Sequence, residues 1–178
     1  MDKHILLKKL IGYVCMFKDF KSVFINVLQR RPFAVAYVKG SEKYPALMGT
    51  VSFHQSMSGV LVVADICGLP QSEDECGRHI FAMHIHEGGE CSGNDKDVFE
   101  NAGQHYNPKK CRHPQHAGDL PPLFSANSCA WYAFLTDRFK IKDIIGKTVI
   151  VHEGVDDFST DPSGMAGAKI ACGVIKKY

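Results

Sequence analysis

The chain has 178 residues, of which 45% are hydrophobic and 22% are charged, with a formal net charge of +2. A chain of this length can bury a hydrophobic core without help from disulfides or metals, so one domain plus an extension is expected. The net charge is too small to indicate binding of the whole chain to nucleic acid, which is therefore not an expected partner.

Residues 1–31 differ in composition from the rest of the chain. They carry seven Lys/Arg and two Asp, a net charge of +5, whereas the remaining 14 Lys/Arg and 17 Asp/Glu give −3. We predict a basic amphipathic helical extension over residues 1–31, followed by a domain over residues 32–178. The apolar residues of the extension recur at spacings of three and four, the period of one helix face: Leu6, Leu10, Tyr13, Phe17, Phe20, Phe24 and Leu28.

Three interpretations of this extension remain open. We favour a helix that packs on the domain, or a true start of translation at Met16. Contact with a membrane surface or a partner through residues 1–31 is less favoured, because basic amphipathic patterns are weak evidence. Lys18, Asp19 and Lys21 interrupt the apolar run that a secretory signal requires, and no segment approaches the ~20 apolar residues of a membrane span. The absence of a legible signal predicts a cytoplasmic location, with a secreted or periplasmic one as the alternative.

Beyond Arg31 short runs of alternating apolar and polar residues are separated by Gly, Ser and Pro, a pattern typical of an antiparallel sandwich or barrel. A long loop from Glu87 to about Phe124 contains four prolines, so regular structure is not expected there. A second loop runs from Glu153 to about Ala166. Loops as long as the first are usually functional in compact domains. The predicted strands are Phe33–Val38, Met48–His54, Gly59–Ile66, Ile80–His86, Ala130–Leu135, Thr148–His152 and Lys169–Ile175.

Histidines are concentrated between Ala82 and Leu120, where five of the nine lie. Imidazole is the commonest biological ligand for zinc and copper. His84 and His86 are two residues apart on a predicted strand, so their side chains leave the same face. His152 ends another predicted strand and would complete a set of ligands across the sheet. The long loop supplies three histidines and a carboxylate, which form a good tetrahedral zinc shell: His105, His113, His116 and Asp119.

The remaining histidines and cysteines receive plainer interpretations. His54 and His79 lie beside predicted strands and are expected to be ordinary strand-face residues. Seven cysteines are an odd number, so at least one cannot pair within the chain. Cys67 and Cys76 flank one short loop and could pair, although the sequence cannot establish the connectivity. Three others receive no role at this stage: Cys15, Cys111 and Cys129.

Five motifs in chain order resemble those of the copper/zinc superoxide dismutases. They are HIHE at His84, GQHYNP around His105, HAGDL from His116, VHEGVDD at Val151 and GAKIACGVI near the C-terminus. The resemblance covers about Phe33 to Ile175, and the GDLP run at Gly118 is similar to the bacterial branch. It implies an all-β fold, an eight-stranded Greek-key β-barrel of immunoglobulin-like sandwich type, with two long loops over the metals. That fold agrees with the predicted strands and loops.

The same resemblance implies a site that contains copper and zinc. Copper would be bound by His84, His86, His105 and His152, and zinc by His105, His113, His116 and Asp119. His105 would therefore bridge the two metals as an imidazolate. Asp156 would link a copper-side histidine to a zinc-side histidine, in keeping with the general role of outer-shell carboxylates in orienting ligands. Cys91 and Cys172 would form the family disulfide between the long loop and the last strand.

The activity that the resemblance implies is dismutation of superoxide to oxygen and hydrogen peroxide. His105 would accept a proton in one half of the cycle and return it in the other. Because superoxide is a small anion, positive charge near copper should speed its capture. Lys169 occupies the position, three residues before the cysteine of the ACGVI motif, where the family usually has an arginine. Lysine keeps the charge but lacks the planar fork of donors, which predicts a working dismutase slower than an arginine version.

A metal-binding protein of the same fold, which buffers or delivers copper and zinc with little dismutase activity, is the alternative. Such family members usually lack ligand histidines, and none is missing here, although a buffering protein would need no guiding cation. Between His113 and His116 lie only Pro114 and Gln115, a shorter segment than the family generally has. The zinc loop is therefore expected to close more tightly. A homodimer is compatible with the resemblance, but family members pair through different surfaces.

Overall fold

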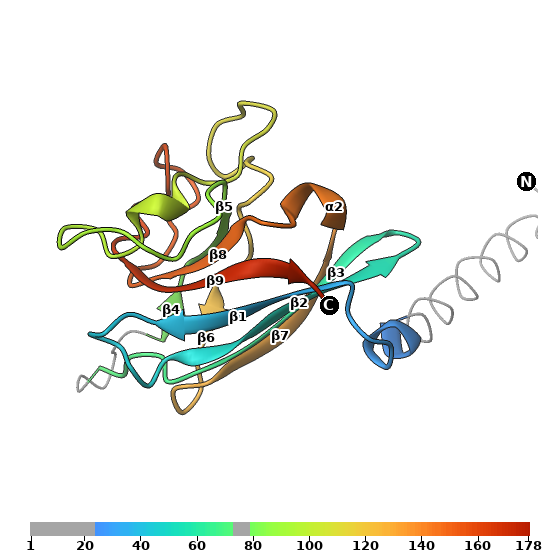
Figure 1. Ribbon diagram of the computed structural model, residues 1–178, viewed down its shortest axis with the longest axis horizontal. Helices are drawn as coiled ribbons and strands as arrows, with labels where there is room; N and C mark the ends of the chain where they lie inside the picture. The colour runs from blue at the N-terminus through green and yellow to red at the C-terminus, as the bar shows by residue number, and fades with distance from the viewer. Residues whose placement is uncertain (1–23, 73–78) are drawn as a thin grey trace, which may run out of the picture.

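The computed structural model describes residues 24–72 and 79–178, so most of the predicted extension, and Cys76, lie outside the described residues. No helix in these two ranges is long and apolar enough to cross a membrane. The described chain is built mainly from antiparallel strands (Figure 1). They are β1 (Ala34–Gly40), β2 (Met48–Ser56), β3 (Gly59–Cys67), β4 (Ile80–Phe81), β5 (Met83–His86), β6 (Leu123–Phe124), β7 (Ala130–Thr136), β8 (Thr148–His152) and β9 (Lys169–Lys177).

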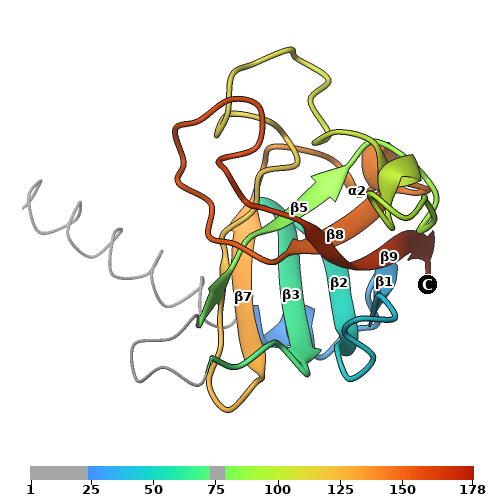
Figure 2. The same cartoon turned by 90° about the vertical axis from the view of Figure 1, so that its left-hand side faces the viewer.

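Seven of these strands form one curled sheet in the order β5-β8-β9-β1-β2-β3-β7, and β4 pairs separately with β6. The order departs from chain order where β9 lies between β8 and β1, which is the kind of long-range pairing that a Greek-key barrel requires. Figure 1 shows the curvature of the sheet, and Figure 2 shows the long loops gathered at one end of it. The predicted all-β barrel with two long loops is confirmed.

The alternation of apolar residues explains why these segments form strands. In β1 the side chains of Ala34, Ala36 and Val38 are buried, whereas Tyr37 between them is 61% exposed. Successive side chains of a strand point to opposite faces, so one face enters the core and the other meets solvent. The same holds at the start of β7, where Trp131 is 63% exposed and its neighbour Tyr132 packs against the core.

The strand predicted over Ile80–His86 is divided at Ala82. Its first part, β4, pairs with β6, and its second part, β5, pairs with β8. Ala82 itself still exchanges hydrogen bonds with the β8 side, since its N–H donates to Gly154 O at 2.8 Å and its carbonyl accepts from His152 N–H at 2.9 Å. This division, together with the short β6 inside the predicted loop, raises the strand number among the described residues above the expected eight.

The long loop is more regular than the prolines suggested, because part of it pairs with the free edge of β5. Ile85 N–H donates to Gly118 O, and Ile85 O accepts from Tyr106 N–H, each at 2.8 Å. Isolated bridges join His84 to Asp119 and His86 to His105. The loop residues with metal-binding side chains are therefore set in register against β5.

Within the described part of the chain, two disulfides link elements that are distant in sequence. Cys91 and Cys172 join the long loop to β9, as the resemblance implied. The pairing of Cys67 with Cys76, which the sequence left open, does not occur, because Cys67 is bonded to Cys129. The physical reason is strand pairing: β3 and β7 are antiparallel neighbours, and Ile66 lies opposite Ala130. Cys67, which follows Ile66, is therefore close to Cys129, which precedes Ala130. Cys111 is a free thiol.

We expect the Cys67–Cys129 disulfide to stabilise the barrel by constraining the unfolded chain. The bonded residues are 62 positions apart, and closing a loop of that size is worth about 2–4 kcal/mol. The double variant Cys67→Ala/Cys129→Ala should lower the free energy of unfolding by that amount in urea titrations of the oxidised protein. Cys111→Ala is the matched control and should change stability by less than about 0.5 kcal/mol. Equal stability of the double variant and the control would contradict this account.

Candidate metal centre

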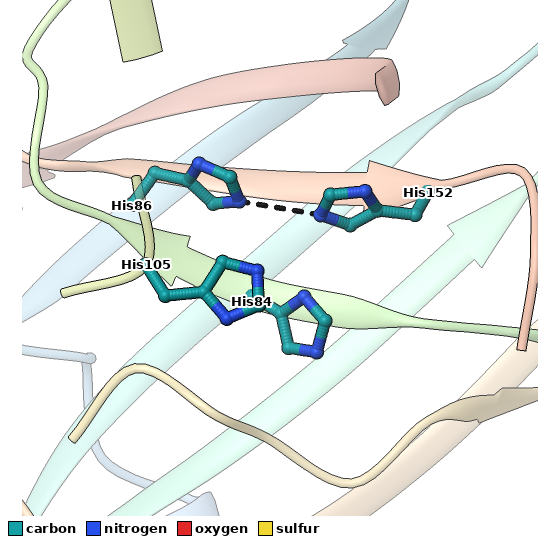
Figure 3. Close-up of side chains that lie close together, drawn as sticks. All are labelled: His84, His86, His105 and His152. Atoms are coloured by element: carbon teal, nitrogen blue, oxygen red, sulfur yellow. Dashed lines mark hydrogen bonds between the residues drawn. The ribbon is translucent and has the colours of Figure 1, made fainter. Parts of the chain in front are cut away.

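Four imidazoles converge above the outer face of β5 and β8 (Figure 3). His84 and His86 leave the same face of β5, as predicted, while Met83 and Ile85 enter the barrel core. His152 ends the neighbouring β8, and His105 comes from the long loop opposite His86. One nitrogen from each of the four rings lies within 4.8 Å of the other three: His84, His86, His105 and His152.

The rings of this first group are held from outside and present their other nitrogen to a common centre. The Nδ1–H of His86 donates to Gly103 O at 2.8 Å, and that of His152 to Gly167 O at 3.2 Å. Their Nε2 atoms consequently face each other at 3.2 Å (Figure 3). His84 binds an outer carboxylate through Nε2, and its buried Nδ1 has no hydrogen-bond partner among the described residues. This arrangement suits metal-binding histidines, whose second nitrogen is normally held by an acceptor.

A second group lies beside the first and is built from the long loop alone. Asp119 is its centre: its carboxylate oxygens lie 2.8 Å from His105 Nδ1, 3.1 Å from His113 Nδ1 and 3.3 Å from His116 Nδ1. The backbone N–H of His116 also donates to Asp119 at 2.9 Å. Three imidazole nitrogens and one carboxylate, all buried and mutually within 4.8 Å, form the donor set of a tetrahedral zinc site.

His105 belongs to both groups. Its Nδ1 faces Asp119 in the second group, whereas its Nε2 is buried without a hydrogen-bond partner among residues 24–72 and 79–178. The centroids of the His105 and His84 rings are 4.0 Å apart, so the ring of His105 lies against the first group. An imidazole with one nitrogen directed to each group can connect two metal ions.

Asp156 connects the two groups from behind. Its Oδ2 lies 2.8 Å from His84 Nε2 and its Oδ1 lies 2.8 Å from His113 Nε2, so one carboxylate orients a histidine of each group. The second loop approaches this pair so closely that only glycine fits at position 164. A Cβ there would lie 2.1 Å from Asp156 Oδ1 and 2.7 Å from His113 Nε2. Asp161 adds a further link, because it accepts the backbone N–H of His113 at 2.7 Å.

Burial determines the protonation of this site. It lowers the pKa of His86 and of His152 well below the ordinary value, and nearby imidazoles lower both further. Burial also lowers the pKa of His105, although the hydrogen bond with Asp119 opposes it. For Asp156, burial raises the pKa, but hydrogen bonds from His84 and Phe158 outweigh it and lower the value to about 2. Neutral imidazoles and ionised carboxylates are the forms that bind metals.

The donor sets fit copper and zinc. Buried ring nitrogens are normally hydrogen-bonded, and leaving one unpaired costs about 1–3 kcal/mol. Two such nitrogens, His84 Nδ1 and His105 Nε2, have no partner among the described residues, and Nδ1 of His113 and of His116 contact only the Asp119 carboxylate there, without a hydrogen bond. Imidazole suits copper and zinc alike, and the added carboxylate of the second group suits zinc.

Two residues that support the site were not predicted from the sequence. Arg138 follows β7, and its Nη1 lies 3.0 Å from Pro114 O, 3.2 Å from His116 O and 3.2 Å from Asp119 O. The guanidinium thus binds three carbonyls of the short segment from Pro114 to Asp119. In this segment the chain turns tightly enough for His113 and His116 both to contact the Asp119 carboxylate. No local pattern marks Arg138, because its partners are about 20 residues away in the chain. The second missed residue, Asp97, contacts Lys169.

The first group is reached through a pocket of about 590 Å³. His86, His105 and His152 line it, and so does Lys169, whose backbone lies opposite His152 in the β8–β9 ladder. His113 and His116 of the second group are not among the described residues that line this pocket. An anion that enters this pocket therefore meets the first group of imidazoles and a lysine ammonium group.

Comparison with known proteins agrees with this geometry. Residues 47–175 match the family model described as copper/zinc superoxide dismutase (SODC). The chain belongs to the copper/zinc superoxide dismutase family. It is 35% identical over 143 residues to "Superoxide dismutase [Cu-Zn]" of Photobacterium leiognathi, covering 72% of this chain and 79% of the relative. It is 32% identical to "Superoxide dismutase [Cu-Zn] 2" of Aquifex aeolicus (73% and 80%) and 34% identical to "Superoxide dismutase [Cu-Zn]" of Legionella pneumophila (74% and 80%).

Membership of this family confirms the predicted activity and cofactors. The protein is an enzyme that dismutates superoxide, and copper and zinc are its metals. The bacterial relatives agree with the similarity seen at the GDLP run.

The metal-free protein should lose stability as the pH falls from 7 towards 4. The pKa values of His86, His105 and His152 in the folded state lie below the ordinary 6.5. At a pH between the folded-state pKa and 6.5, the unfolded chain therefore binds more protons than the folded one. The stability is therefore complete above about pH 6.5 and decreases below it. Urea titrations at several pH values measure this effect, and copper and zinc should move the loss to lower pH because metals compete with protons. A metal-free protein of constant stability down to pH 5 would disprove it.

Replacing Asp156 by Asn should weaken zinc binding by about 10- to 100-fold, the usual effect of losing an outer carboxylate. The amide cannot accept from both His84 and His113, so the orientation of one of them is lost. Competition with a chelator measures the zinc dissociation constant. Asp157→Asn is the matched control, because the hydrogen bonds found for the Asp157 carboxylate within residues 24–72 and 79–178 join it to Ser159 and Thr160 of its own loop. Equal zinc affinity of the two variants would show that Asp156 does not contribute to zinc binding.

Proposed function

We propose that the first group holds copper, the second holds zinc, and His105 joins the two. The copper-binding residues are His84, His86, His105 and His152, and the zinc-binding residues are His105, His113, His116 and Asp119. The observation that supports this proposal most strongly is the placement of His105, whose Nδ1 contacts Asp119 while its buried Nε2 faces the other three imidazoles without a partner of its own.

In this proposal His105 is the residue that takes up and returns a proton. Copper supplies one-electron oxidation and reduction of superoxide. In the structure Nδ1 of His105 faces Asp119; once zinc is bound on that side, a proton on this ring would be carried by Nε2. His105 lines the pocket that leads to solvent, so a proton bound at its Nε2 would be close to a substrate anion in that pocket. Asp119 and Asp156 hold the rings in place while this occurs.

Lys169 is the proposed cation for superoxide capture. Its side chain is 14% exposed and lies in the wall of the pocket beside the copper-binding imidazoles. An ammonium group at this place attracts a small anion and raises its local concentration. It cannot bind the anion through two parallel N–H groups as a guanidinium can.

The state of association and the compartment stay predictions. A homodimer is supported by exposed apolar side chains on the outer face of the sheet, among them Tyr37 at 61% and Trp131 at 63% exposure. Light scattering of the purified protein tests it. Membrane-surface contact through residues 1–31 remains the less favoured hypothesis, and a cytoplasmic location remains the favoured one.

The decisive experiment measures dismutase activity and metal content of the purified protein before and after loading with copper and zinc. We expect rapid, copper-dependent turnover at one copper and one zinc per chain, the stoichiometry of the two groups. His105→Gln keeps a polar side chain of similar reach but removes the second ring nitrogen. It should abolish most of the turnover and weaken zinc binding. Full occupancy by both metals without turnover would favour metal buffering instead.

Lys169→Arg should raise the second-order rate constant for superoxide, since the guanidinium adds paired donors at the same charge. The expected gain is about 2- to 10-fold, the size of one added charge-assisted hydrogen bond. Pulse radiolysis of the fully metallated variant measures it. An unchanged or lower rate would show that the fork of donors is unimportant at this position.

A further inference from the structure

We propose that Asp97 is a positioning residue for the dismutase reaction: it fixes the ammonium group of Lys169 in the pocket wall and offsets part of its charge. This inference rests on the proposed role of Lys169 in superoxide capture. It adds a carboxylate to the machinery that attracts the substrate, on a loop that supplies no metal ligand before His105.

The contact between the two residues is short and directed. Lys169 Nζ donates to Asp97 Oδ2 at 2.7 Å and to the carbonyl of Phe99 at 3.1 Å. An ammonium group has three N–H donors, so these two acceptors leave one for solvent or an anion. A free lysine side chain occupies many rotamers, and holding it costs up to about 2 kcal/mol in entropy. Asp97 and Phe99 together provide the orientation that an arginine fork would have by itself.

The position of the pair relates it to the copper-side pocket. Lys169 lies opposite His152 across the β8–β9 ladder, and both residues line the pocket, as does Asp97. The pair is only partly exposed, with 14% for the Lys169 side chain and 38% for that of Asp97. Its electrostatic interaction is therefore less screened than that of a fully exposed surface pair.

The loop that carries Asp97 is held in place by contacts that do not involve its carboxylate. The Cys91–Cys172 disulfide joins the loop to β9 three residues beyond Lys169. Phe99 and Ala102 pack against Ile150 and Cys172 in a small buried cluster. The loop can therefore keep its course when the charge of Asp97 is removed, which separates positioning of Lys169 from folding of the loop.

Charge in the pocket wall is nearly balanced. Among the residues that the structure describes, three cationic and three acidic side chains line it: Lys43, Lys96, Lys169, Asp95, Asp97 and Glu153. Asp97 lies closest to the lysine proposed to meet the substrate, so beyond a few ångströms the two charges largely cancel. Removing the negative charge while keeping an acceptor should leave the ammonium group in place with its full attraction for anions.

The experiment compares Asp97→Asn with Asp97→Ala in the fully metallated protein. Asn keeps one oxygen, which can replace Oδ2 as the acceptor for Lys169 while the amide gives up the Phe99 N–H that Asp97 Oδ1 accepts at 3.1 Å. Ala keeps no side-chain acceptor. We expect Asp97→Asn to raise the second-order rate constant for superoxide about 2- to 5-fold at low ionic strength, and to steepen its decrease with salt. Azide, titrated by the copper absorption band, should bind tighter by a similar factor. Asp97→Ala should gain less in both measurements.

Asp95→Asn is the matched control. Asp95 lines the same pocket, and no hydrogen bond or ion pair to Lys169 is found for it among the described residues. It therefore reports the general effect of removing one negative charge. In a Lys169→Met background, the gain from Asp97→Asn should fall to the gain from Asp95→Asn. In the metal-free protein, the ¹H–¹⁵N signal of the Lys169 ammonium group, assigned by its loss in Lys169→Met, should be slow to exchange in the parent and weakened in Asp97→Ala.

The outcomes separate this inference from the role of Lys169. If Lys169→Met changes neither the rate nor azide binding, Lys169 does not capture the anion and both proposals are overturned. If Lys169→Met slows the reaction but Asp97→Asn and Asp97→Ala both behave like Asp95→Asn, Lys169 keeps its role and Asp97 loses the positioning role. Dependence of the Asp97→Asn gain on Lys169, together with loss of the ammonium signal in Asp97→Ala, supports the proposal.

Discussion

The hydrogen bonds of Ile85 to the long loop are the constraint on which the metal centre depends. β5 uses one edge to pair with β8, and without a partner its other edge would expose unpaired N–H and C=O groups. The loop supplies Gly118 O and Tyr106 N–H to that edge. Because the loop is then in register with β5, His105 lies opposite His86 and Asp119 opposite His84. The same two bonds that complete the sheet also bring together ligands from segments far apart in the sequence.

A cluster of seven buried metal-binding side chains is unfavourable without its metals. Buried imidazoles cannot easily accept protons, and their inward nitrogens have lost hydrogen bonds to water. The structure offsets part of this cost with outer acceptors: Gly103 O, Gly167 O and the Asp156 carboxylate. These acceptors hold the rings but leave the inward nitrogens free. Metal ions bound to these nitrogens remove the rest of this unfavourable free energy, so binding of copper and zinc adds to the stability of the folded state.

The sequence predicts most of what depends on local pattern. The alternation of apolar residues predicts the strands, and the two-residue spacing of His84 and His86 places both on one face. Residues brought together by sheet pairing could not be found in this way. Cys67 meets Cys129 because β3 pairs with β7, and Arg138 reaches the segment from Pro114 to Asp119 through the tertiary arrangement of the folded barrel. The division of the fourth strand at Ala82 depends on hydrogen bonds to β8 and the loop that follows it, which no local signal records.

The contact of Asp97 with Lys169 is only partly predictable from the sequence. The implied disulfide between Cys91 and Cys172 already brings the loop that follows Cys91 close to the start of β9, where Lys169 is found. A carboxylate six residues after one cysteine and a lysine three residues before the other are therefore candidates for a contact. A lysine in place of an arginine makes that contact useful, because an ammonium group on four flexible carbons has no orientation of its own. The carboxylate and the Phe99 carbonyl provide it, while the charge of the carboxylate weakens the attraction for the anion that the lysine serves.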